Sequence, residues 1–271
     1  MPEAASVSCP VARVDVVALF GGRGFEGKQG VSQIAGLAGE NLRKRRRMMG
    51  IFDFLKRNKK KVHNTTENGI IGECVSIEPD FPRPFGYKIC WYAVKNEDPQ
   101  SVMDKLGLKV IRESNWKDGL DRTYGSRTCV FVSPQLDDYV LVVGVTPDVD
   151  HNVVKKHALS FDEIQYFGTH RVSEYCAYAK FENGKMIRCY CYVGDMGEVT
   201  WCEGNMTPEE MRLGFDKFPQ RTDELLSDDF DYDNIPDEES ILSIAKAWGI
   251  DTTFESKTYE KGTGFICQFP A

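Results

Sequence analysis

After residue 80, apolar and polar residues alternate in short stretches, which is the pattern of half-buried β-strands. Stretches rich in β-branched and aromatic residues lie at positions 87–94, 162–167 and 262–269. Two further stretches, 129–133 and 139–146, flank a short segment that begins with proline. Together they predict a hairpin, so strands account for most of this part of the chain.

The clearest hairpin has Asn183-Gly184 at its tip, because a two-residue type I′ turn needs positive φ at both positions. A strand at 198–202 returns beside it, which places Cys202 next to Cys189. The register predicted from this turn pairs Glu182 with Lys185, Tyr178 with Cys189, and Cys176 with Cys191.

Three helices are marked in the sequence, two by start signals and one by an apolar stripe. Asp98-Pro99 starts a helix that ends at Gly107, and Thr207-Pro208-Glu209-Glu210 forms a capping box. Residues 237–248 carry apolar side chains at the i, i+3, i+4 and i+7 positions of a helix. Helices and strands do not alternate as they do in parallel sheets. We therefore predict an α+β fold with a mostly antiparallel sheet, a central meander at about 162–202, and flanking helices.

Charge divides the chain of 271 residues, whose net charge is −7, into unlike parts. Residues 43–61 carry ten basic side chains and one acidic one, whereas residues 62–271 have a net charge of −15. An acidic body repels phosphate, so we expect no nucleic-acid partner for it.

The first 70 residues differ from the rest. We interpret residues 1–48 as a non-native or disordered extension, with translation starting at Met48 or Met49. The alternative is that the basic run 43–47 is a nuclear-localisation or anionic-surface patch. Residues 49–70 form a basic leader and linker, whose part 49–61 has the composition for weak contact with a membrane surface. Residues 71–271 are then a single acidic α+β domain.

The compartment follows from what the chain contains. No apolar run reaches the length of a membrane helix, and the N-terminus has no basic region ahead of its apolar stretch. Nine cysteines, an odd number, are spread along a chain long enough to bury a core without disulfides. This usage indicates reduced thiols in a cytoplasm.

Four cysteines raise the question of a metal site. In the predicted register, Cys176, Cys189, Cys191 and Cys202 lie on one face of three strands. A flat sheet separates Cys176 from Cys202 by about 11 Å, too far for one tetrahedral zinc ion. We predict no metal and no cofactor, with the cysteines as small buried side chains. The strand geometry allows a Cys176–Cys191 disulfide, which a reducing compartment disfavours.

An acidic run at 223–239 holds nine carboxylates and no base. Its start resembles a calcium loop, but Asn234, Pro236 and Ser240 stand at three positions where that loop needs other residues or a carboxylate ligand. The acidic run is therefore either a solvated loop or a surface that binds a basic protein. The predicted contact residues are Asp223, Glu224, Asp228, Asp229, Asp231 and Asp233.

His170 is the best catalytic candidate, because a histidine beside Arg171 and near Glu174 has the groups for acid–base work or anion binding. No nucleophile motif and no phosphate-binding loop accompanies it. The alternative is a structural network that braces the sheet.

Several short markers occur in a fixed order from Trp116 onward. They are Trp116-Lys117-Asp118-Gly119-Leu120, Phe131-Val132-Ser133-Pro134, Phe167-Gly168-Thr169-His170-Arg171-Val172, Tyr192-Val193-Gly194-Asp195, and Pro236-Asp237-Glu238 with Trp248. This order resembles a family of uncharacterised bacterial cytoplasmic proteins over roughly residues 80–255. The resemblance implies bacterial origin and one shared domain. It implies no activity and therefore no catalytic residue.

Two functions from different classes fit these features. The first is a non-enzymatic module that binds a basic protein, as an immunity or antitoxin-like inhibitor does. The second is an enzyme, such as a hydrolase, with its site around His170 and Arg171. The acidic body and the missing nucleophile, metal and phosphate signatures favour the first.

Overall fold

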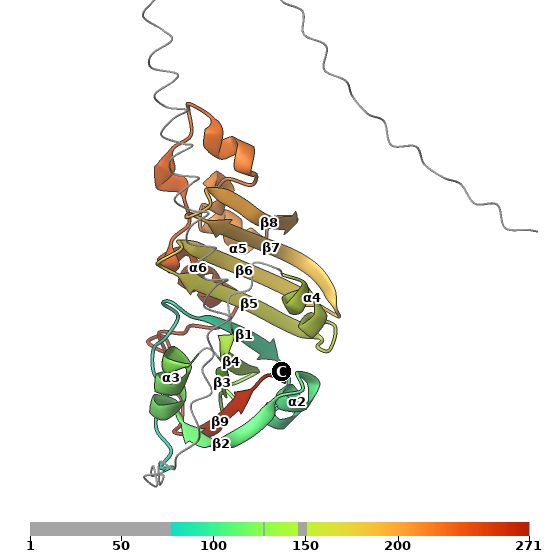
Figure 1. Cartoon of the computed structure of the whole chain (residues 1–271), viewed down its shortest axis with the longest axis vertical. Coiled ribbons are helices and arrows are strands. Elements are labelled where there is room, and N and C mark those ends of the chain that lie inside the picture. The colour runs from blue at the N-terminus through green and yellow to red at the C-terminus, as the bar shows by residue number, and fades with distance from the viewer. Residues whose placement is uncertain (1–76, 127, 146–150, 271) are drawn as a thin grey trace, which may run out of the picture. The chain divides into compact units, whose positions relative to one another are not determined.

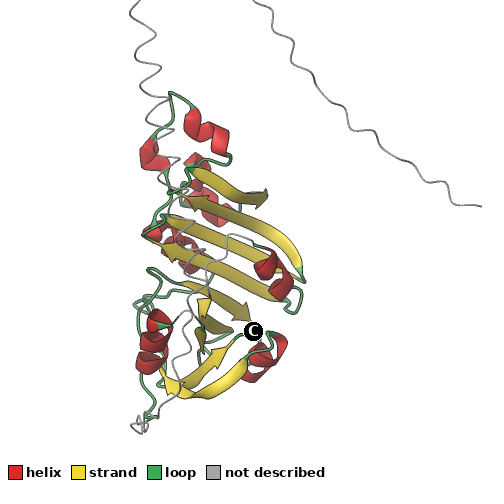
Figure 2. Ribbon diagram, viewed as in Figure 1, coloured by secondary structure: helices red, strands yellow, loops and turns green. Residues whose placement is uncertain are grey.

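The computed structural model describes residues 77–126, 128–145 and 151–270, and the strands of this part form one sheet (Figures 1 and 2). The segments interpreted above as extension, leader and linker, 1–48 and 49–70, lie outside the described residues. The strands are β1 (Cys90–Lys95), β2 (Lys109–Asn115), β3 (Cys129–Val132), β4 (Tyr139–Val145), β5 (Glu163–His170), β6 (Tyr175–Glu182), β7 (Lys185–Val193), β8 (Glu198–Gly204) and β9 (Thr263–Gln268). The helices are α2 (Pro99–Lys105), α3 (Trp116–Gly125), α4 (Asn152–Ala158), α5 (Pro208–Arg212) and α6 (Glu238–Ala247).

The nine described strands follow the order β2-β9-β3-β4-β1-β5-β6-β7-β8, and every neighbouring pair is antiparallel. The structure therefore confirms an α+β fold with an antiparallel sheet. Strands β5 to β8 do lie next to one another in chain order. They form one end of the sheet, however, while β1 occupies its middle, so the predicted meander at 162–202 is not central.

Both faces of the sheet are buried beneath separate layers. Helices α2 and α4 contribute to the core of one face, called here the first face. Helices α3 and α6 contribute to the core of the other, the second face, and Figure 1 shows the two pairs on opposite sides. Burial on both sides explains why β1 and β4 are almost continuously apolar rather than alternating.

Three helices begin where the sequence predicts. The Asp98 side chain caps α2, and the Asp237 carboxylate accepts a hydrogen bond from the Ser240 backbone N (2.8 Å) at the start of α6. At α5, the Glu210 backbone N donates to Thr207 Oγ1 (3.3 Å), and the Thr207 backbone N donates to Glu210 Oε2 (2.7 Å). Each such cap stabilises its helix by about 1 kcal/mol, because it satisfies backbone donors that the helix leaves unpaired.

The register between β6 and β7 differs from the prediction because of one extra residue. The pairs nearest the turn are Glu182 with Lys185, Phe181 with Met186, and Lys180 with Arg188. Ile187 is thus a β-bulge, and it displaces the rest of β7 by one position. Beyond the bulge, Tyr178 pairs with Tyr190 and Cys176 with Tyr192.

This bulge redistributes the four cysteines. Cys189 and Cys191 lie in the core of the first face, whereas Cys176 lies in the core of the second, and Cys202 packs against that second core. The prediction that all four share one face is wrong, since a one-residue slip reverses the face of every later side chain. Cys176 and Cys191 are free thiols on opposite faces, which excludes the disulfide considered above.

The two outer strands are protected in different ways. In β2, an irregularity at Ile111 interrupts the pairing with β9, and exposed charges at Lys109, Arg112 and Glu113 line the strand. At β8, the Thr222 hydroxyl accepts a hydrogen bond from the Val199 backbone N (3.1 Å). Bulges, charges and covering loops each discourage another chain from adding to a sheet edge.

Candidate functional site

The acidic run folds as a series of short turns between β8 and α6. Two 3-10 turns, Thr222–Leu226 and Tyr232–Asn234, carry three of its carboxylates, Asp223, Glu224 and Asp233. The Asp231 carboxylate accepts a hydrogen bond from the Asp233 backbone N (3.1 Å), and Ser227 Oγ accepts one from the Asp229 backbone N (3.3 Å). These local bonds give the segment a defined conformation without a long-range network.

The six predicted contact residues fall into two groups. Arg221, two residues before Asp223, pairs with that carboxylate (Nε–Oδ1 2.9 Å) and with Glu224 (Nη1–Oε1 3.5 Å). The hydrogen bond from Arg221 lowers the pKa of Asp223 below its ordinary value. The second group is exposed and forms no ion pair with any described residue. It consists of Asp228, Asp229, Asp231 and Asp233.

Apolar side chains project from among these four carboxylates, and the sequence reasoning missed them. Leu226 is 80% exposed and Tyr232 is 66% exposed. The Tyr232 hydroxyl donates to the backbone O of the buried Leu225 (3.3 Å), and its ring meets that of Phe230 edge-on at 5.2 Å. We call residues 226–233 the acidic loop. It combines an uncompensated negative charge with two exposed anchors, a pairing that acidic composition alone does not reveal.

His170 and its neighbours lie at the turn between β5 and β6 but do not converge. The half-buried His170 ring lies with Nδ1 3.1 Å from Ser173 Oγ, within the same turn. The exposed Arg171 donates through Nε to Glu238 Oε2 of α6 (2.8 Å), and its guanidinium lies 5.9 Å from the centre of the Tyr87 ring. Arg171 therefore ties the turn to α6.

Glu174 points in another direction. It is exposed, has a positive φ of 48°, and its side chain lies over Gly194, where an added Cβ would come within 2.0 Å of Glu174 Oε2. Among the described residues, no hydrogen bond or ion pair joins His170, Arg171 and Glu174 to one another. The three groups form no shared acid–base constellation.

A buried polar network on the second face was also missed by sequence reasoning. Arg188 donates through Nε to Glu210 Oε1 (2.8 Å), with side chains only 2% and 0% exposed. The Tyr178 hydroxyl donates to the same oxygen (2.7 Å), and Arg188 Nη2 donates to Gln220 Oε1 (2.9 Å). Burial and then the Glu210 charge raise the pKa of Tyr178, so this hydroxyl keeps its proton and its bond. The network fastens α5 and the following loop to β6 and β7.

The described cysteines differ sharply in thiol acidity, which gives a first prediction. Burial alone would raise the pKa of Cys129, but hydrogen bonds from Ser126, Arg122 and Thr128 outweigh it and lower that pKa. Burial raises the pKa of Cys90 to about 12. Since the thiolate is the species that reacts, iodoacetamide at neutral pH should label Cys129 well before Cys90 in the folded protein.

Peptide mass spectrometry over a time course measures both rates. Arg122→Gln should slow the labelling of Cys129 and leave Cys90 unchanged, because it removes one donor to the thiolate. Equal labelling rates for Cys129 and Cys90 in the folded protein would contradict the predicted difference in thiol pKa.

The described residues contain neither a metal-binding cluster nor a membrane-spanning helix. In that part of the chain, no group of three or more histidine, cysteine or acidic side chains is placed to hold a metal ion. None of its helices has both the length and the apolar character required to cross a bilayer.

Comparison with known proteins adds no relative. No protein-family model, curated protein or solved structure matches the chain. The resemblance described under Sequence analysis stays a prediction.

Proposed function

We propose that this chain is a non-enzymatic protein-binding module that takes a basic protein partner on its acidic loop, in the manner of an immunity or antitoxin-like inhibitor. The observation that carries the proposal is the exposure of Leu226 and Tyr232 among four carboxylates that no described cation neutralises. The resemblance stated above and the seven free thiols of the described residues support a bacterial cytoplasm as its location.

The two kinds of side chain have separate roles in binding. Four uncompensated carboxylates attract a cationic protein over a distance and raise its association rate, but hydrated carboxylates alone give little lasting affinity. Tyr232 and Leu226 provide apolar surface that a partner can bury, and tyrosine is among the residues most enriched at energetic centres of interfaces. The partner is therefore expected to have an apolar depression ringed by lysine or arginine.

The geometry around His170 supports the enzyme alternative less well. A general base needs a free approach to substrate and a second group that orients it. Here Arg171 is engaged by Glu238, and Glu174 lies over Gly194 and forms no hydrogen bond with His170. These contacts indicate a structural role, in which the turn is fixed to the sheet and to α6.

Binding is tested by immobilising the chain, capturing a partner from a bacterial extract at low salt, and measuring the kinetics with the purified partner. Replacing Asp228, Asp229, Asp231 and Asp233 by asparagine should lower the association rate about tenfold or more at low salt. Asparagine keeps a side-chain acceptor at position 231, so the turn is expected to persist. Tyr232→Ala should instead speed dissociation and weaken Kd at least fivefold, roughly 1 kcal/mol.

A matched control is Leu159→Ala, which removes an apolar side chain that is 71% exposed just after α4. It should leave both rate constants unchanged. Recovery of no partner, recovery of an acidic partner, or a partner insensitive to both loop variants would contradict the proposal.

A further inference from the structure

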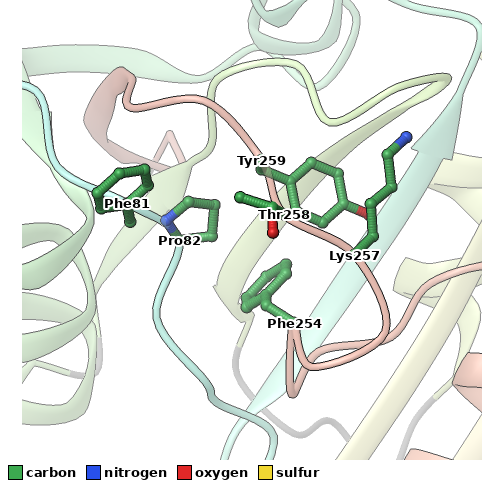
Figure 3. Close-up of a pocket in the computed structure, with 6 residues that line it drawn as sticks. All are labelled: Phe81, Pro82, Phe254, Lys257, Thr258 and Tyr259. Carbon is green, nitrogen blue, oxygen red and sulfur yellow. The ribbon is translucent and has the colours of Figure 1, made fainter.

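An aromatic groove lies apart from the acidic loop, between the chain segment before β1 and the segment before β9. Its cavity volume is about 180 Å³. Figure 3 shows Phe81 and Pro82 on one side, Tyr259 on the other, and Phe254 below them. The remaining lining residues are Lys257 and Thr258. The groove is large enough for one or two small rings of a ligand.

The two walls of the groove are held in place by bonds to the rest of the fold. The Gly262 backbone N donates to the Asp80 backbone O (3.0 Å), which joins the wall segments at one end. The Asp80 carboxylate in turn accepts from the Trp116 backbone N (2.6 Å) at the start of α3. The walls therefore keep their spacing without a ligand, which reduces the ordering cost of binding.

The floor is equally well anchored. The Phe254 ring packs edge-on against Trp116 at 5.5 Å and against Tyr259 at 5.7 Å. Its backbone has a positive φ of 56°, which is unusual for a bulky side chain. Phe254 thus gives the groove a rigid aromatic base that packs against the core of the second face.

Each polar side chain at the groove carries a hydrogen-bond donor, and the two lysine ammonium groups cannot accept. Lys261 Nζ lies 5.2 Å from the centre of the Phe81 ring and forms no ion pair with a described residue. Lys257 is paired with Asp137 and lies 5.4 Å from the centre of the Tyr259 ring. The exposed Thr258 hydroxyl makes no hydrogen bond to a described residue. A fitting ligand therefore offers flat apolar rings, hydrogen-bond acceptors and a negative charge.

We propose that this groove binds an extended, proline-rich segment of another protein in which an acidic residue accompanies the prolines. Proline rings lie flat on aromatic faces, and proline brings no backbone N–H that would need an acceptor beside lysine groups that can only donate. A polyproline II segment presents its carbonyl groups outward, where the Thr258 hydroxyl and a lysine ammonium can donate to them. The Lys261 ammonium group pairs with the carboxylate of the acidic residue. This site is separate from the acidic loop and does not depend on the function proposed for it.

The test uses the full chain and three fluorescently labelled peptides in anisotropy titrations. They have the sequences Glu-Pro-Pro-Glu-Pro-Pro, Lys-Pro-Pro-Lys-Pro-Pro and Glu-Ala-Ala-Glu-Ala-Ala. The peptide Glu-Pro-Pro-Glu-Pro-Pro should bind, and the alanine peptide should bind at least tenfold more weakly. Phe81→Ala should weaken binding of the glutamate–proline peptide at least fivefold. The Phe81 side chain is 53% exposed, and the substitution removes the ring face on which a proline would lie. Lys261→Glu should reverse the preference between the glutamate and lysine peptides.

Both substituted side chains are exposed, so an unchanged thermal midpoint is expected and verifies that the variants are folded. The four-asparagine variant of the acidic loop is the matched control and should bind the peptide as the natural chain does. The proposal is overturned by equal binding of the proline and alanine peptides, by no binding at millimolar peptide, or by Phe81→Ala leaving affinity unchanged.

Discussion

Replacing Glu210 by glutamine is expected to lower the free energy of unfolding by about 3–5 kcal/mol, because it leaves a buried guanidinium without its counter-ion. Arg188 is only 2% exposed, and its remaining partners are neutral groups, namely the oxygens of Gln220 and Gly204 and the sulfur of Cys202. Glutamine has nearly the same shape as glutamate, so the packing is kept, and the loss reports on the charge and on the one acceptor oxygen that the amide replaces. Urea unfolding with linear extrapolation measures it.

The neighbouring residue provides a matched control on the same helix. Glu209 pairs with Arg212 in an exposed position, at 27% and 69% exposure. Glu209→Gln should therefore change stability by only about 0–1 kcal/mol. The double replacement Arg188→Met with Glu210→Leu should recover much of the loss, because two apolar groups need no counter-ion. Equal effects at positions 209 and 210 would contradict the burial argument.

Gly204→Ala is the second substitution with a large expected effect, about 2–5 kcal/mol from backbone strain and overpacking together. Gly204 has a φ of +82°, and an added Cβ would lie 2.1 Å from the backbone O of Ile187. That carbonyl belongs to the β-bulge, so it cannot move without disturbing the register of β7. Thermal and urea unfolding both measure the effect.

Gly197 separates the two contributions. Its φ of +61° carries the same left-handed penalty, but an added Cβ would meet nothing within 4 Å. Gly197→Ala should therefore cost only about 1–2 kcal/mol. If the two alanine variants unfold at the same denaturant concentration, the close approach of β8 to the bulge is not important for stability.

Local signals in the sequence predicted local structure well. The Asn183-Gly184 turn, the helix start at Asp98, and the capping box at Thr207 all lie where expected. Each of these signals involves only neighbouring residues, so tertiary context does not override it. Helix α3 was missed although Asn115 and Asp118 have capping spacing, because Gly119 and Gly125 weaken its helical pattern.

Long-range features were less accessible. Counting outward from a turn assigns register only while no residue is extra, and nothing about Ile187 itself marks it as a bulge. β2 escaped prediction because most of its residues are exposed, leaving no buried face to produce alternation. In the acidic run, composition predicted the charges but not which carboxylates Arg221 neutralises, nor that Leu226 and Tyr232 point outward. Those facts depend on the turns between them.

The separate layers on the two faces of the sheet have a spectroscopic consequence. Three of the four tryptophans, Trp91, Trp116 and Trp248, lie in the core of the second face, and Trp201 alone lies in the first, stacked on His151 at 4.1 Å. Intrinsic emission of the natural chain therefore reports mainly on one layer, whereas a chain that keeps only Trp201 reports on the other. Coincident unfolding curves from the two chains would mean that the layers melt as one cooperative unit across their shared sheet.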